Sequence, residues 1–194
     1  ETNERLAKHG ILVAQHALVQ KADWQVDAIA FYQKIEAQFA YPFIAKPHDD
    51  GCSSAVKKLK NRADLEAYCH LAFREADELP KQWREVLHLQ KNEEFPRKTV
   101  FLVEDLITAN GAERFLEVTG GMLTHWADGQ RRYETFEPSE ALATGDVLSL
   151  EEKFLAGQGQ NITPARYSID LEQNRRISLK VQETLRKTAE ILGV

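Results

Sequence analysis

Residues 43–56, Phe43-Ile-Ala-Lys-Pro-His-Asp-Asp-Gly-Cys-Ser-Ser-Ala-Val56, predict a strand that ends at Lys46 and leads into a polar loop. A lysine at the end of a strand supplies a point charge for phosphates, and a small-residue loop supplies free backbone N–H groups. Gly51 is expected to give the loop conformational freedom, and Ser53 and Ser54 add hydroxyls with little bulk. A second alternating apolar run follows, over residues 55–60. The pattern indicates a nucleoside-triphosphate site, although a solvated lysine before a turn gives the same pattern.

The composition is that of a folded protein, with 43% hydrophobic and 28% charged residues in a chain of 194. No run approaches the roughly 18 apolar residues of a membrane span, and the formal net charge of −5 argues against a nucleic-acid surface. Cys52 and Cys69 lack CxxC spacing, and the six histidines are scattered, so neither a disulfide framework nor a zinc site is predicted. We expect a reduced, cytoplasmic protein without nucleic-acid or membrane partners.

Hydrophobic spacing predicts an α+β fold in two lobes. Gly10 is expected to end a first helix, and Asp23 is a candidate N-cap for a second, which carries apolar residues from Val26 to Phe39. Asp128-Gly129 predicts a hairpin turn. Further helices are expected over residues 62–78, 80–92 and 171–192, and strands over 11–19, 43–46, 99–107, 114–123, 132–137 and 147–154. The strand over 99–107 is apolar on both faces, which indicates burial.

Four stretches, in the same order along the chain, resemble the D-alanine–D-alanine ligases of the ATP-grasp superfamily. They are residues 1–13, 43–56, 101–113 and 150–165, the last of which contains Leu-Glu-Glu-Lys-Phe and Pro-Ala. The resemblance implies an ATP-grasp fold: residues 1–17 lead in, a small lobe covers 18–105, and a larger lobe covers 106–194. It also implies ATP with Mg²⁺ as cofactors and a carboxylate–amine ligation through an acylphosphate. The product would be D-alanyl-D-alanine for peptidoglycan, made by a cytoplasmic homodimer.

The nucleotide-binding residues that the resemblance implies lie on three predicted strands and the segments that follow them. Lys46 would contact the α- and β-phosphates, and Lys153 would reach phosphate from the other lobe. Glu104 would face the adenine amino group, and Glu113 would bind the ribose hydroxyls. Backbone groups near Asp105 and Ile107 would pair with the edge of the adenine ring, and Phe101 and Leu106 would wall the adenine pocket. Surface or core roles remain open for each, and for Glu104 the alternative is a salt bridge to a lysine.

The chain departs from the family pattern at three places. Cys52 stands where the family has a serine that orients the substrate carboxylate, so orientation is expected to pass to Ser53 or the backbone. Phe154 replaces a tyrosine of the acceptor site. The magnesium ligands of the family are expected beyond residue 194, so this chain is expected to be the central part of a longer ligase and inactive alone. The alternatives are an ATP-grasp ligase with another amino-acid or hydroxy-acid acceptor, or a non-catalytic nucleotide-binding domain.

Overall fold

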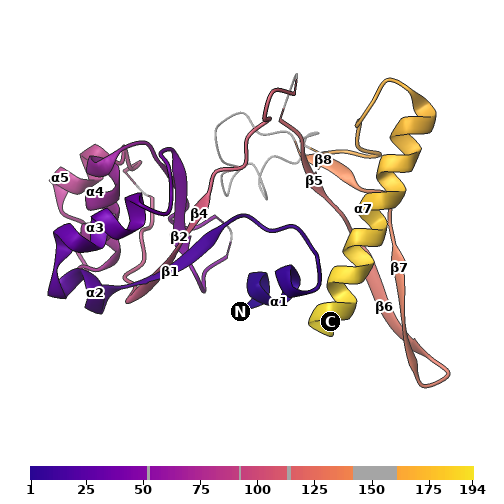
Figure 1. Ribbon diagram of the computed structural model, residues 1–194, viewed down its shortest axis with the longest axis horizontal. Helices are drawn as coiled ribbons and strands as arrows, with labels where there is room; N and C mark the ends of the chain where they lie inside the picture. Colours follow the sequence, from indigo (N-terminus) through magenta and orange to yellow (C-terminus); the bar gives the residue numbers. More distant parts are fainter. Residues whose placement is uncertain (52, 92, 113–114, 142–160) are drawn as a thin grey trace. The chain divides into compact units, whose positions relative to one another are not determined.

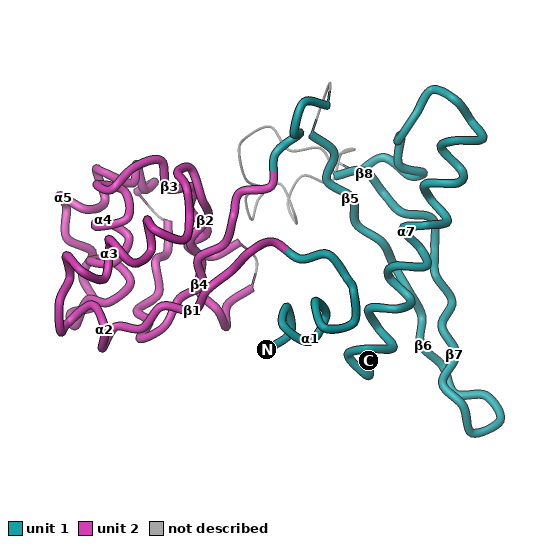
Figure 2. Tube along the Cα trace, in the orientation of Figure 1, with its two compact units in different colours: residues 1–13, 108–143, 156–194 teal, residues 14–107, 144–155 magenta. Residues whose placement is uncertain are grey.

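The computed structural model describes all residues except 52, 92, 113–114 and 142–160. The chain divides into two compact units, shown in Figure 2. Unit 1 comprises residues 1–13, 108–143 and 156–194, and unit 2 comprises residues 14–107 and 144–155. Both units combine helices with antiparallel strands, so the predicted α+β class is confirmed.

Unit 2 is a four-stranded antiparallel sheet with helices gathered on one of its faces (Figure 1). In spatial order its strands are β1 (His16–Gln20), β4 (Val100–Asp105), β2 (Phe43–Pro47) and β3 (Lys57–Leu59). Its helices are α2 (Lys21–Val26), α3 (Ala28–Glu36), α4 (Arg62–Ala72) and α5 (Lys81–Val86). The core lies between the helices and one sheet face, where the largest fully buried side chains include Tyr68, Phe43, Phe73 and Phe101.

The expected burial of β4 on both faces is wrong. Phe101 and Val103 are fully buried on the helix-covered face, whereas Leu102 and Glu104 on the other face are only partly buried. The Phe101 ring centroid lies 4.8 Å from that of Tyr68. Phe101 is therefore a core residue and does not wall a nucleotide pocket, because alternate side chains of a strand point to opposite faces.

The helix expected from an Asp23 cap is two helices. Asp23 lies inside α2, and Asp27 caps α3 instead, with its Oδ1 accepting a hydrogen bond from the Ala30 N–H at 3.0 Å. Val26 and Ile29, which were expected on the apolar face, are 88% and 66% exposed. Asp23 and Asp27 are four residues apart, and in the sequence either one is an acceptable N-cap. The start of α3 at Ala28 makes Asp27 the residue that caps it.

Unit 1 contains two small sheets and a long helix. Its elements are α1 (Thr2–Lys8), β5 (Glu117–Thr119), β6 (Met122–Ala127), β7 (Gln130–Thr135), β8 (Ser139–Ala141), β9 (Asn161–Ile162) and α7 (Leu171–Leu192). The order β5-β8-β9 forms one sheet, and the β6–β7 hairpin forms the other. Asp128 and Gly129 turn the hairpin as predicted, with φ of +52° and +73°. The strand expected over 147–154 lies outside the described residues.

Helix α7 has the predicted bounds and packs beside the β6–β7 hairpin (Figure 1). Asp170 caps its start by accepting from the Gln173 N–H at 2.7 Å, and Gly193, at φ +75°, ends it. A Cβ at Gly120 would lie 2.1 Å from Leu185 Cδ1. The absence of a side chain at position 120 therefore lets α7 approach the short segment between β5 and β6.

Candidate functional site

Lys46 and Glu104 lie on the sheet face of unit 2 that the helices leave uncovered. The register pairs Lys46 with Leu102 and Ile44 with Glu104. Since residues two apart on a strand share a face, the lysine and the glutamate are diagonal neighbours on adjacent strands. Their side chains are 33% and 16% exposed, and Lys46 Nζ forms an ion pair with Glu104 Oε1. The two residues expected to hold ATP are thus brought together, and they are each other's partners.

Contacts with the rest of unit 2 hold the polar loop between β2 and β3 at its start and at its end. The carbonyl of Val100 lies 3.3 Å from His48 Nδ1, and the carbonyl of Ala55 accepts a 3.1 Å hydrogen bond from the buried Tyr68 hydroxyl. The positive φ values in the loop belong to Ser53 (+59°) and Ala55 (+50°). Gly51 is not among the residues with positive φ, so in the described part of this loop the left-handed conformations fall on Ser53 and Ala55 instead.

The lysine Lys98, just before β4, binds the first half of this loop. Its Nζ lies 2.7 Å from Asp49 Oδ1 and 3.0 Å from Asp50 Oδ1. The hydrogen bond to Asp49 raises the pKa of Lys98, and the same contact lowers the pKa of the Asp49 carboxyl. Sequence reasoning missed Lys98; the available signal was two adjacent carboxylates in a loop expected to bind triphosphate, which require a nearby cation.

At the end of β4 and just after it, the backbone groups differ in whether they form hydrogen bonds. The Asp105 N–H donates to the Gln15 carbonyl at 2.9 Å, so this donor is occupied. Within the described part of the chain, the backbones of Leu106 and Ile107 form no hydrogen bond. Leu106 is partly buried and Ile107 is 65% exposed. A ring edge can therefore pair with the backbone at 106 and 107, but not with the Asp105 N–H.

Three of the predicted site residues, Cys52, Glu113 and Lys153, lie outside the described residues, as does Phe154. Ser53 is partly buried, and its hydroxyl has no hydrogen-bond partner among the described residues. The structure therefore brings Lys46 and Glu104 together, with Asp105, Leu106 and Ile107 directly after the glutamate along the chain. The roles of all these residues stay predictions.

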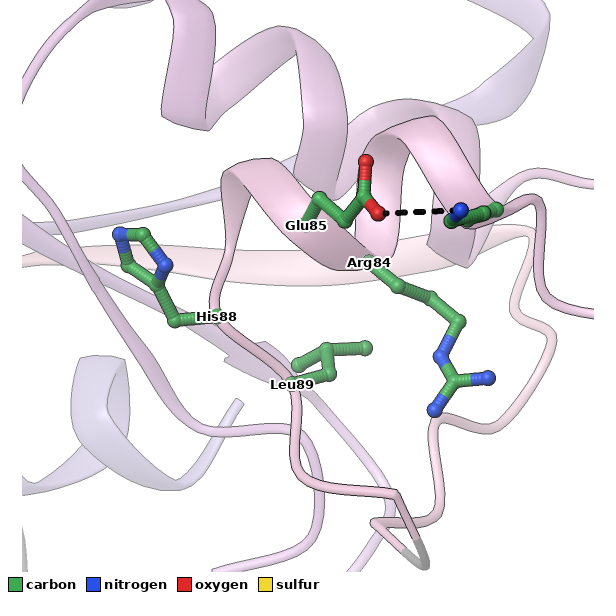
Figure 3. Close-up of a pocket in the computed structure, with 5 residues that line it drawn as sticks. Arg84, Glu85, His88 and Leu89 are labelled. Carbon is green, nitrogen blue, oxygen red and sulfur yellow. Dashed lines mark ion pairs between the residues drawn. The ribbon is translucent and has the colours of Figure 1, made fainter.

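A cavity of about 620 Å³ lies beside α5 and contains none of the predicted residues. Its lining is Lys81, Arg84, Glu85, His88 and Leu89. In Figure 3 the Arg84 and His88 side chains point in different directions, so the guanidinium and the imidazole do not converge on one point. Lys81 Nζ is 3.7 Å from Glu85 Oε1. This cavity does not have the convergent groups that a phosphate site needs.

A second cavity, of about 450 Å³, is bounded on one side by the β2–β3 loop through Asp50, Gly51 and Ser54. The rest of its lining is Arg74, Asp77, Leu79, Glu94, Phe95 and Pro96. The Arg74 guanidinium donates to the carbonyls of Leu71 and Asp77. Arg74 is thus already held by backbone oxygens rather than aimed at the loop.

Within the residues that the structure describes, no group of three or more His, Cys, Asp or Glu side chains is placed to hold a metal ion. Of the helices among those residues, none is long and apolar enough to cross a membrane.

Comparisons with known proteins agree on one family. Residues 6–79 match the model of the family described as "D-ala D-ala ligase C-terminus". A D-alanine--D-alanine ligase of Geobacillus kaustophilus (strain HTA426) is 39% identical over 67 residues, which is 34% of this chain and 18% of that protein. One of Caldicellulosiruptor bescii is 26% identical over 157 residues, which is 81% of this chain and 34% of that protein.

The crystal structure of VanG D-Ala:D-Ser ligase from Enterococcus faecalis resembles this chain with a TM-score of 0.57 and 22% sequence identity. The likeness covers 99% of this chain and 43% of that one, and it supports the ATP-grasp fold. This chain matches well under two thirds of the length of each of these relatives. The family match over residues 6–79 and these relatives show that the chain is similar to the D-alanine–D-alanine ligases.

Proposed function

We propose that this chain is the ATP-binding portion of an ATP-dependent carboxylate–amine ligase that forms D-alanyl-D-alanine for peptidoglycan. The observation that carries the proposal is the ion pair between Lys46 and Glu104 on the uncovered sheet face. A phosphate anion can replace Glu104 as the partner of Lys46, and the adenine amino group can replace Lys46 as a donor to Glu104. ATP supplies both replacements in one molecule, whereas a free anion leaves the carboxylate without a donor.

The remaining contacts to ATP are proposed from the chain order and the open backbone. The groups at Leu106 and Ile107 would pair with the adenine edge, because their backbones form no hydrogen bond within the described chain. Asp105 would border the adenine edge, but its N–H would not pair with the ring, because it already donates to the Gln15 carbonyl. Glu113 would bind the ribose hydroxyls, as the family resemblance implies.

In the proposed reaction, an oxygen of the carboxylate substrate attacks the γ-phosphorus of ATP, the bond to the β,γ-bridging oxygen breaks, and ADP leaves. The amine of the second substrate then attacks the acyl carbon, loses a proton and expels inorganic phosphate. Lys46 and Lys153 would balance the charge of the phosphates during these steps. Ser53 or Cys52 would orient the carboxylate. Mg²⁺ is expected with ATP, but the described residues hold no ligand cluster for it, and none is assigned to the metal.

The acceptor is proposed to be D-alanine, which the names of the sequence relatives carry. Two departures from the family pattern support a second candidate for the acceptor. Phe154 stands where the family has a tyrosine hydroxyl, and Cys52 stands where it has a serine. Loss of one buried hydrogen-bonding group changes binding by about 1–3 kcal/mol when its partner stays unpaired. A ligase with another amino-acid or hydroxy-acid acceptor is therefore the second proposal. The intact protein would be a cytoplasmic homodimer.

Phosphate release from Mg-ATP by the intact protein tests the proposal. D-alanine, D-serine, D-lactate and L-alanine are offered one at a time, with an enzyme-free blank. We expect release that depends on D-alanine, with a dipeptide product detected by mass spectrometry. Release with another acceptor alone would replace the first candidate by the second. ATP binding without release under any condition would favour a non-catalytic nucleotide-binding domain.

A further inference from the structure

The loop expected to receive a triphosphate contains two adjacent carboxylates, which oppose that ligand. Asp49 and Asp50 follow Lys46 within four residues. Like charges a few ångströms apart repel strongly when partly shielded from water, so two carboxylates beside a triphosphate weaken its binding. The Lys46 ammonium is paired with Glu104, and in the proposed complex it faces the phosphates, so in neither state does it neutralise the two aspartates. The loop therefore needs a second cation.

Lys98 is the cation placed to neutralise both aspartates. A single ammonium bridges them, at 2.7 Å from Asp49 Oδ1 and 3.0 Å from Asp50 Oδ1. The Lys98 side chain is only 15% exposed, so solvent competes less for it than for a surface lysine. His48 is also near, with Nδ1 3.5 Å from Asp49 Oδ1, but it contacts only that aspartate.

The backbone holds Lys98 in this position from both sides. Its N–H donates to the Ala72 carbonyl at the end of α4, at 2.7 Å, and the next carbonyl, of Thr99, accepts from the Lys21 N–H at 2.8 Å. The ammonium thus extends from a fixed strand edge toward the loop. A cation held in advance costs no rearrangement when the ligand arrives.

We infer that Lys98 is a positioning residue for the nucleotide: by neutralising Asp49 and Asp50, it makes the β2–β3 loop able to accept a triphosphate. The inference rests on the proposed function, since it concerns the same ATP site. Lys98 need not touch ATP. Its role is electrostatic, and it acts through the two aspartates.

Calorimetric titration with ATP tests the inference in the full-length protein and its variants. In Lys98→Met we expect ATP to bind about tenfold more weakly, and this deficit should shrink at high salt because added ions screen the exposed aspartates. Lys98→Arg keeps the charge and should bind ATP like wild type. Asp49→Asn and Asp50→Asn, added together to Lys98→Met, should restore the affinity to within about threefold of wild type.

Lys21→Met is the matched control. Lys21 is 14% exposed, lies in the same unit and forms its ion pair with Glu75, so its loss removes one positive charge without exposing Asp49 or Asp50. We expect ATP affinity in this control to stay near that of wild type. Should Lys98→Met fail to fold, the Asp49→Asn/Asp50→Asn variant with Lys98 intact provides the test, and it should bind ATP at least as tightly as wild type.

The outcomes separate the inference from the proposed function. Wild-type protein that binds no ATP would overturn both. Wild-type binding that Lys98→Met leaves unchanged would overturn the inference alone. A triple variant as weak as Lys98→Met, or an Asp49→Asn/Asp50→Asn variant weaker than wild type, would likewise show that charge neutralisation is not the role of Lys98.

Discussion

Replacing Lys46 by alanine should separate its role in ATP binding from its role in stability. The Lys46–Glu104 ion pair is partly exposed, so its loss should cost about 1 kcal/mol of unfolding free energy, or about 4–8 °C in Tm for a unit of this size. A charge-assisted contact with phosphate contributes about 2.5 kcal/mol, but the wild-type protein must first give up the ion pair, which offsets about 1 kcal/mol. The remaining 1.5 kcal/mol or so corresponds to about a tenfold weaker Kd.

The assay is calorimetric titration with ATP, combined with thermal unfolding of the same samples and with phosphate release at saturating ATP. Lys57→Ala is the control, because Lys57 lies on the neighbouring strand, is 19% exposed and pairs with Glu93. Its register partner is the fully buried Ala45, which places it on the opposite sheet face. The control should lose a similar amount of stability and keep ATP affinity. Wild-type turnover and ATP affinity in Lys46→Ala would refute the role given to Lys46.

Three further predictions concern the fold that holds the site. Phe101→Ala should lower the unfolding free energy by about 3–5 kcal/mol in denaturant titrations, because the ring is fully buried; a loss below about 1 kcal/mol would contradict a core position. Burial raises the pKa of the Cys69 thiol well above its usual range, so in a Cys52→Ser variant DTNB should label no thiol until the protein unfolds; rapid labelling of folded protein would refute this. The Arg62 guanidinium, donating to Glu36, lowers the pKa of that carboxyl, so its stabilisation is present above the unfolded pKa of about 4.3 and is lost as pH falls through the lower folded pKa. The Tm difference between wild type and Glu36→Gln should therefore be constant above about pH 5 and vanish in acid; a difference that persists at about pH 2 would contradict it.

Local signals predicted the elements that local chemistry determines. Helix α7 has the bounds that its periodicity indicated, because Asp170 caps one end and Gly193 ends the other. The Asp128-Gly129 turn likewise forms where the sequence places it, since both residues adopt positive φ readily. Signals of this kind lie within a few residues of the feature they specify.

Features that depend on tertiary contacts could not be predicted in the same way. The apolar pattern of β4 does not say which face the helices cover, so Phe101 and Leu102 look alike in the sequence. Lys46 and Glu104 are 58 residues apart, and only the strand register makes them partners. Lys98 lies in a charged stretch that carries no motif, and its contact with Asp49 appears only when the loop and the start of β4 are adjacent.

Hydrogen–deuterium exchange with and without ATP tests most directly whether the uncovered sheet face of unit 2 binds the nucleotide. Slower exchange is expected in peptides that cover residues 43–59 and 100–107, and at an ATP concentration about equal to the wild-type Kd this protection should be much weaker in Lys46→Ala than in wild type. Unchanged exchange in both segments while ATP is bound, or protection confined to the cavity beside α5, would contradict the assignment of the site.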